Sequence, residues 1–282
     1  MILSVPKHFV STTAMHGTYA RHSAFDHTMN FIRDDTLVSL HDKDRTLSPL
    51  GIRLNVDTAR FETLRKTIDT VKISASGILI NGQEILYQDV FLIDHDLIKQ
   101  INTKGSITNP MRHKLYREME GAIARHADQQ DILSRKTLDD RIESLRRAFE
   151  KEPLDDRTLH EKIKALIGLG PGLTPSGDDI LAGLLAGLIM QGRKQTFEQT
   201  APLVRKGVLH PNQTSIVSRQ FLLYATQGIF IGEILMLHHR LLLSRAIDQI
   251  IDKIASMGHS SGIDYLKGLM LAISIGGINH DS

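Results

Sequence analysis

One sequence pattern, Ser-Gly-x-Asp-x-Leu-x-Gly-Leu, occurs twice in the chain, at residues 176–184 and 261–269. Each copy places a small capping residue, an aspartate in the first helical turn and a glycine one turn further along the same side. Two helices with this pattern can pack as a pseudo-equivalent pair. We therefore predict that the first turns after Ser176 and Ser261 border one pocket. The alternative is a chance similarity between two capped apolar helices.

A segment with four glycines and two prolines, residues 168–177, leads into the first copy. Glycine lets the backbone adopt positive φ and approach a bound group closely. Thr174 or Ser176 is suited to cap the helix that follows, and N–H groups at a helix N-terminus can bind carboxylate or phosphate. We expect an anion-binding loop, in which Asp178 and Asp179 either compete with the anion or hold a metal for it. A loop that only lets two helices pack closely is the alternative.

The loop lacks the features of the common nucleotide-binding motifs. A Walker loop needs a lysine directly after its last glycine, and no lysine lies between Lys164 and Arg193. A dinucleotide-binding fingerprint follows a strand, whereas residues 159–167 are predicted to be helical. We expect no nucleotide cofactor, and Mg²⁺ stays open as a cofactor.

Residues 180–189, which follow the loop, are apolar on nearly every side of the predicted helix. A helix without a polar face belongs in the interior of its domain. Gly183 and Gly187 each cost about 1 kcal/mol of helix propensity and are tolerated where another helix must approach closely. This helix is therefore expected to support the loop rigidly from the domain centre.

The spacing of apolar residues divides the chain into two regions. Up to about residue 105, short alternating segments predict strands, and Asn81-Gly82 predicts the turn of a hairpin. The remaining residues have apolar side chains at helical spacing. The predicted fold class is α+β, with an N-terminal β-rich domain (1–105) followed by a larger all-helical domain (106–282).

Composition argues against several classes of protein. The 34 basic and 32 acidic side chains nearly balance, so we expect no nucleic-acid partner. The absence of cysteine excludes thiol nucleophiles and Cys-zinc sites and agrees with a cytoplasmic protein. The longest apolar segments are too short to span a bilayer, so no membrane association is expected.

The candidate site combines the two repeats with the glycine loop. Backbone N–H groups of the loop would hold an oxyanion, the charged aspartates would orient an amide or bind Mg²⁺, and the histidine before the second repeat would move a proton. No residue is assigned as a metal ligand. The candidate catalytic residues are Asp178, Asp179, His259 and Asp264. The candidate substrate-binding residues are Gly170, Gly172, Thr174, Ser176, Gly177, Ser261 and Gly262, with His22 and Ser23 from a polar cluster that an exposed loop explains about as well.

Residues 172–184, with Gly-Leu-Thr-Pro-Ser-Gly-Asp-Asp followed by Leu-x-Gly-Leu, and residues 258–264, with Gly-His-Ser-Ser-Gly-x-Asp, resemble the family of the H subunit of oxamate carbamoyltransferase. Weaker matches at residues 22–30 and 214–218 extend the resemblance over most of the chain. The first motif is very specific.

The resemblance implies a cytoplasmic subunit in the anaerobic breakdown of allantoin and purines. The reaction would transfer a carbamoyl group from oxalurate to phosphate and yield oxamate and carbamoyl phosphate. The implied partners are a small carboxylate or amide substrate, phosphate and two other carbamoyltransferase subunits, and association with copies of itself stays open. The alternative is a non-catalytic subunit that binds a small anion or serves as a scaffold. The resemblance assigns no catalytic residues.

Overall fold

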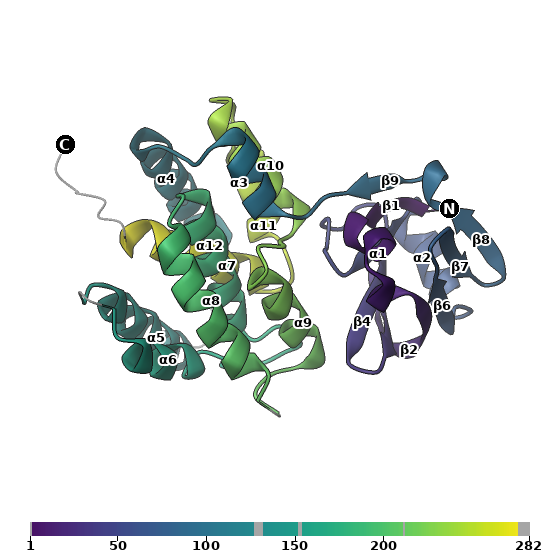
Figure 1. Ribbon diagram of the computed structural model, residues 1–282, viewed down its shortest axis with the longest axis horizontal. Helices are drawn as coiled ribbons and strands as arrows, with labels where there is room; N and C mark the ends of the chain where they lie inside the picture. Colours follow the sequence, from purple (N-terminus) through teal and green to yellow (C-terminus); the bar gives the residue numbers. More distant parts are fainter. Residues whose placement is uncertain (1, 127–131, 152–153, 211, 276–282) are drawn as a thin grey trace. The chain divides into compact units, whose positions relative to one another are not determined.

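The chain forms two compact units, Met1–His95 and Asp96–Ser282. The computed structural model describes residues 2–126, 132–151, 154–210 and 212–275. The first unit is built on a β-sheet and the second on helices, as Figure 1 shows, so the predicted α+β fold class is confirmed.

Within the described residues, the N-terminal unit contains one nine-stranded sheet with the strand order β8-β7-β6-β2-β3-β4-β5-β1-β9. The β4–β5 and β1–β9 pairs are parallel, and the other neighbours are antiparallel. The strands are β1 (Ile2–Pro6), β2 (Gly17–Phe25), β3 (Thr28–Arg33), β4 (Thr36–His41), β5 (Gly51–Leu54), β6 (Thr70–Ile73), β7 (Gly77–Ile80), β8 (Gln83–Leu86) and β9 (Phe91–Ile93). Two short helices, α1 (Lys7–Ser11) and α2 (Thr58–Arg65), and two short 3-10 segments, η1 (Thr13–Met15) and η2 (Tyr87–Asp89), complete the unit.

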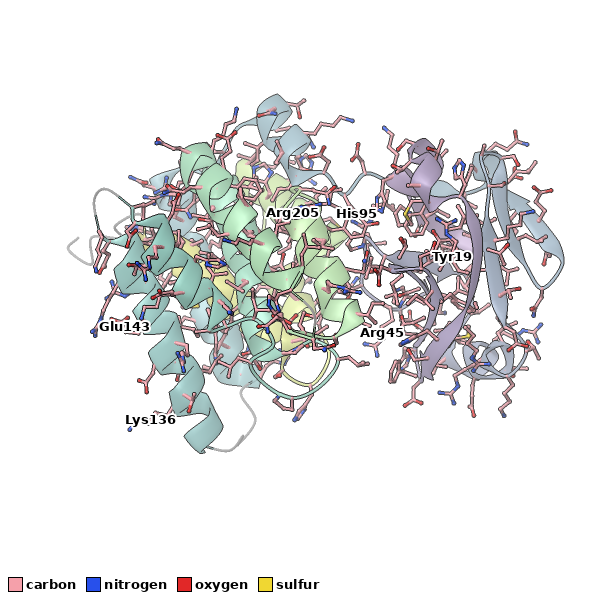
Figure 2. All side chains as sticks on the ribbon, turned by 60° about the horizontal axis from the view of Figure 1, so that its bottom comes forward. Tyr19, Arg45, His95, Lys136, Glu143 and Arg205 are labelled. Atoms are coloured by element: carbon pink, nitrogen blue, oxygen red, sulfur yellow. The ribbon has the colours of Figure 1, made fainter. Side chains whose placement is uncertain are left out.

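The predicted hairpin is confirmed, because β7 and β8 pair in antiparallel register around Asn81 and Gly82, with φ values of 50° and 77°. Strand β2 was missed, although at nine residues it is a long strand. Its middle is polar, yet β3 and β6 hydrogen-bond to it on either side. Tyr19 of β2, labelled in Figure 2, is fully buried, and the Arg33 guanidinium lies 4.9 Å from the centre of its ring.

The second unit consists of helices around a continuous apolar core. The described helices are α3 (Leu97–Lys104), α4 (Asn109–His126), α5 (Ile132–Phe149), α6 (Asp156–Lys164), α7 (Ser176–Met190), α8 (Lys194–Val208), α9 (Ile216–Ala225), α10 (Gly232–Leu242), α11 (Asp248–Ala255) and α12 (Ser261–Ile275). Helices α7 and α12 pack along their length in the middle of this unit (Figure 1). Every residue of α7 from Ile180 onward is buried, so its predicted central position is confirmed.

Helices α7 and α12 cross with their backbones in direct contact, and the glycines of the two repeats make this possible. A Cβ atom on Gly183 would lie 2.0 Å from the carbonyl oxygen of Tyr265, and one on Gly268 would lie 2.0 Å from that of Ile180. Ile180 and Tyr265 occupy the same position in their repeats, as do the two glycines. The contacts are therefore related by a pseudo-two-fold axis, which supports a real repeat over a chance similarity.

The outer helices carry paired charges. On α5, the carboxylate of Glu143, labelled in Figure 2, lies 2.7 Å from the Nε of Arg146 and 2.8 Å from the Nε of Arg147. Pairs of this kind on an exposed helical face contribute little to stability and keep the face solvated. Across the described ranges, the apolar helices are all too short to cross a membrane.

Replacing Gly183 with alanine tests the helix crossing. The added methyl group collides with backbone that is held by two helices, so we expect a loss of unfolding free energy of about 1–3 kcal/mol or more. Gly121→Ala on α4 is the control, because the nearest atom there is the end of the flexible Arg125 side chain at 3.2 Å. The control should gain up to about 1 kcal/mol from helix propensity. Urea unfolding measures both, and a Gly183→Ala variant as stable as the parent would contradict the crossing.

A buried histidine predicts how stability depends on pH. His238 of α10 is fully buried; its Nδ1 lies 2.9 Å from the Nε2 of Gln100, and its Nε2 lies 2.9 Å from the carbonyl oxygen of Gly105. Burial lowers the pKa of His238 from 6.5 to about 4. The folded protein therefore binds this proton less well than the unfolded chain, so stability is retained above pH 6.5 and is lost as the pH falls toward 4.

We expect this histidine to contribute a slope of up to about 1.4 kcal/mol per pH unit in that window. His238→Gln should reduce the slope of unfolding free energy against pH, whatever its effect on stability at neutral pH. His160→Gln, at a half-buried position on α6, is the control for the effect of a histidine-to-glutamine exchange as such. Equal slopes for the parent and His238→Gln would contradict the lowered pKa of His238.

Candidate functional site

A cavity of about 710 Å³ lies where the N-terminal ends of α7 and α12 meet. Both repeats contribute to it through their first residues, Ser176 and Ser261, so the two helix ends share one pocket as expected, whereas the residues that follow in the two first turns do not line it. The lining residues are Thr137, Leu138, Leu169, Gly170, Pro171, Gly172, Leu173, Thr174, Ser176, Gly258, His259, Ser260 and Ser261. All of them belong to the helical unit.

The glycine loop has the backbone conformation expected from its sequence. Gly168, Gly170 and Gly172 have φ values of 73°, 111° and 98°, in the region that favours glycine. Gly168 also approaches the backbone closely, since a Cβ there would lie 1.9 Å from the carbonyl oxygen of Gln213. The backbone of Gly170 and Gly172 borders the cavity, which agrees with their expected contact with a ligand.

The expected capping of α7 is wrong. The residue at the N-cap is Pro175, and no side chain caps this helix end. The hydroxyl of Thr174 instead lies 2.7 Å from the hydroxyl of Ser261, across the junction between the two repeats. Tertiary packing therefore takes the Thr174 side chain away from its own helix, and this contact joins the two sides of the cavity.

Gly177 and Gly262 were expected to bind substrate, and the structure places them in packing contacts. Neither lines the cavity. Their N–H groups donate to the carbonyl oxygens of Leu169 and Met257, at 2.9 Å and 3.0 Å. A Cβ on Gly177 would lie 2.0 Å from the carbonyl oxygen of Leu166. Both glycines hold the start of a helix against the preceding segment, so they shape the cavity from behind.

Asp178 fastens the glycine loop to the start of α9. Its side chain is buried and accepts hydrogen bonds from the N–H of Gly168 at 2.8 Å, the hydroxyl of Ser218 at 2.6 Å and the hydroxyl of Thr214. Burial raises the pKa of Asp178, and these three hydrogen bonds act in the opposite direction. Because Asp178 does not line the cavity, its position indicates support of the loop and not contact with a ligand.

Asp179 and Asp264 occupy the same position in the two repeats and interact with each other electrostatically. In the described part of the chain, one buried oxygen of each, Oδ2, has no hydrogen-bond partner. Burial raises the pKa of Asp179 well above its usual value, and the neighbouring carboxyl groups raise it further, while hydrogen bonds with Ser261 and Thr174 lower it. Asp264 differs because the Nζ of Lys267 lies 3.6 Å from its Oδ1.

Sequence reasoning missed Tyr265, the residue that follows Asp264. Its ring is buried, and no hydrogen-bond partner of its hydroxyl is found among the described residues. Burial raises the pKa of Tyr265 well above its usual value, and the charge of Asp179 acts in the same direction. Sequence reasoning also missed Thr137 and Leu138 of α5, which line the cavity. No local pattern singles out these residues, because only the packing of α5 brings them to the repeats.

His259 lines the cavity as an exposed residue just before the second repeat, as its predicted role in proton transfer requires. His22 and Ser23 lie elsewhere, on β2 of the N-terminal unit. There the Ser23 hydroxyl lies 3.1 Å from the Nδ1 of His22 and accepts a hydrogen bond from Asn30, which in turn accepts one from Ser39. The structure therefore builds His22 and Ser23 into a polar network across three strands.

The lining of the cavity contains no Lys, Arg, Asp or Glu within the described residues. Its polar groups are hydroxyls, backbone and one histidine, set among apolar side chains. The same part of the chain has no group of three or more His, Asp or Glu side chains able to hold a metal ion. The arrangement thus suits a small ligand held by neutral hydrogen-bonding groups.

Comparison with protein families identifies the class of protein. Residues 166–273, which include both repeats and most of the cavity lining, match the family model described as oxamate carbamoyltransferase subunit AllH. Residues 2–91 match the AllH family N-terminal domain. The two matches cover most of the chain, which therefore belongs to the AllH family of carbamoyltransferase subunits. No solved structure matches the chain.

Two substitutions of Asp178 separate hydrogen bonding from charge. Asp178→Ala leaves the N–H of Gly168 and two hydroxyls without their acceptor, and we expect it to lower the unfolding free energy by about 1–3 kcal/mol. Asp178→Asn keeps one oxygen for that N–H, and the hydroxyls can turn to accept from the amide, so its loss should stay below about 1 kcal/mol. Denaturant unfolding compares them, and equal losses in both variants would show that the charge matters.

Proposed function

We propose that this chain is the substrate-binding subunit of a carbamoyltransferase that converts oxalurate and phosphate to oxamate and carbamoyl phosphate. The observation that carries the proposal is the cavity itself, which both repeats line inside the segment that matches the carbamoyltransferase subunit family. In this proposal the protein works in the cytoplasm, in the anaerobic breakdown of allantoin and purines, together with two other subunits.

The chemistry of the lining suits a small amide or carboxylate. The hydroxyls of Thr174, Ser176 and Ser261 and the backbone of Gly170 and Gly172 would hold carbonyl or carboxylate oxygens. Apolar side chains of the lining, such as Leu138, would exclude water from the bound group. His259 would move a proton to or from the amide nitrogen at the rim of the cavity.

Asp178, Asp179 and Asp264 have different roles in this proposal. Asp178 holds the loop in place through its three accepted hydrogen bonds, which makes it a positioning residue. Asp179, whose pKa burial raises and hydrogen bonds with Ser261 and Thr174 lower, would orient these hydroxyls toward a bound amide, and Asp264 interacts with Asp179 electrostatically. Residues of this kind hold the groups that contact the ligand in the positions that the reaction needs.

One observation favours the second candidate function, a subunit that binds the small anion while its partners carry out the transfer. Moving a carbamoyl group to phosphate develops negative charge, which enzymes commonly stabilise with cationic side chains or metals. The described lining contains no such cation. A complete site would then need cationic groups from the partner subunits.

Substitution of His259 distinguishes the two functions. In a complex reconstituted with the partner subunits, His259→Gln should lower the rate of carbamoyl phosphate formation about 10²-fold or more if His259 transfers a proton. His160→Gln on α6, outside the cavity, should leave the rate unchanged. A His259→Gln complex that turns over like the parent would contradict the catalytic role and favour the binding subunit.

Measurements on the isolated chain, without the partner subunits, test ligand binding alone. On either candidate function, oxamate should raise the unfolding temperature of the isolated parent chain, since a ligand at 100 times its Kd stabilises by about 2.7 kcal/mol. If neither oxamate nor phosphate stabilises the parent, either alone or in the complex, the proposed role of the cavity is contradicted. The glycine loop would then serve only the close packing of the two helices.

A further inference from the structure

The hydroxyl pair of Thr174 and Ser261 is the feature from which a further property of the cavity can be derived. The two oxygens lie 2.7 Å apart, a usual O–H···O hydrogen-bond distance, and both residues line the cavity. Burial raises the pKa of Asp179 and hydrogen bonding with both hydroxyls lowers it, so its carboxyl group lies beside the pair. Each hydroxyl has one proton, so the state of Asp179 decides where these protons point.

With Asp179 ionised, no proton is left for a ligand. A carboxylate only accepts hydrogen bonds, so it takes one of the two hydroxyl protons, and the 2.7 Å contact between the hydroxyls takes the other. The hydroxyls then present lone pairs to the cavity, with a buried negative charge behind them. This arrangement repels an anion or a carbonyl oxygen.

With Asp179 protonated, the direction of the chain of hydrogen bonds reverses. The carboxyl group donates its own proton to Ser261, Ser261 donates to Thr174, and the Thr174 proton is free to enter the cavity. In the reverse order, the carboxyl group donates to Thr174 and Thr174 donates to Ser261, so the Ser261 proton is free to enter the cavity. The hydroxyl pair now offers a donor to a ligand oxygen, and the buried charge is gone.

The surroundings of Asp179 favour the protonated form. Asp178 on its own helix and Asp264 on α12 both act against its ionisation, as burial does, and the hydroxyls of Thr174 and Ser261 only partly offset them. On α12, the Nζ of Lys267 lies 3.6 Å from the Oδ1 of Asp264, and the buried Tyr265 interacts electrostatically with Asp179. From the loop side, His259 is the titratable residue of the lining in the described chain.

We propose that this cavity binds its ligand through an acceptor oxygen, a carboxylate or phosphate, only while Asp179 carries a proton, so that anion binding and protonation of this buried carboxyl group are coupled. This rests on the proposed function of the cavity as a small-anion site. It differs from the expectation based on the sequence, in which a charged Asp179 served the ligand. By linkage, bound anion must in turn make Asp179 hold its proton more tightly.

Binding of oxamate to the isolated full-length chain, measured by titration calorimetry at pH 7, tests the coupling. Asp179→Asn cannot ionise, but its amide still donates to a hydroxyl, so it should bind within about threefold of the parent. Asp179→Ala cannot ionise either, and it leaves one of the two hydroxyl protons free for the ligand, so its affinity should stay close to that of Asp179→Asn. An Asp179→Asn variant that unfolds like the parent and yet loses tenfold or more in affinity overturns the proposal.

A pH series gives the second, independent measurement. Oxamate keeps its carboxylate ionised between about pH 6 and pH 9, so changes in affinity in this range belong to the protein. Affinity of the parent should fall by up to about tenfold per pH unit once Asp179 ionises, with uptake of one proton on binding, and Asp179→Asn should show no such fall. The same series is measured with His259→Gln alone and with His259→Gln combined with Asp179→Asn. The pH dependence must still differ between these two proteins, because a difference that vanished would belong to His259.

The outcomes separate this proposal from the proposed function. A parent that binds oxamate while Asp179→Asn does not overturns the proton coupling and leaves the anion site standing. An affinity that rises with pH in the parent overturns the coupling in the same way. A parent that binds neither oxamate nor phosphate at any pH overturns the proposed function, and the coupling with it.

Discussion

The direct contact between the backbones of α7 and α12 is the constraint on which the rest of the helical unit depends. Gly183 and Gly268 each lie against a carbonyl oxygen of the opposite helix, so neither position accepts a side chain. Helices that approach this closely also bring their first turns together. The cavity, the hydroxyl pair and the two facing carboxyl groups all follow from that approach.

The crossing has an electrostatic consequence. Asp179 and Asp264 stand at equivalent positions of a pseudo-symmetric pair, where two buried negative charges would repel each other. The symmetry is broken by Lys267, which lies near Asp264 and has apolar Ala182 as its equivalent in α7. One carboxyl group therefore has a compensating cation and the other has hydroxyl groups that line the cavity. A duplicated scaffold thus supports an asymmetric site.

Much of the architecture was predictable because it depends on local properties. The hairpin at Asn81-Gly82, the apolar helix at the centre and the positive φ of the loop glycines each follow from residues that are adjacent in the chain. Strand β2 was not predictable, because its polar middle is held by hydrogen bonds to two neighbouring strands. The cap of α7 was misassigned for a related reason, since Thr174 finds its partner on α12.

The sequence by itself determined that two glycine-bearing helices would meet near a glycine-rich loop, because a repeated pattern encodes repeated geometry. Only the tertiary structure decided what each aspartate does. Asp178 and Asp179 are neighbours in the chain, yet they point to different sides of the helix, one to the donors of α9 and the loop and the other to α12. Burial and hydrogen-bond partners set the charge of a carboxyl group, and both depend on residues that are distant in the sequence.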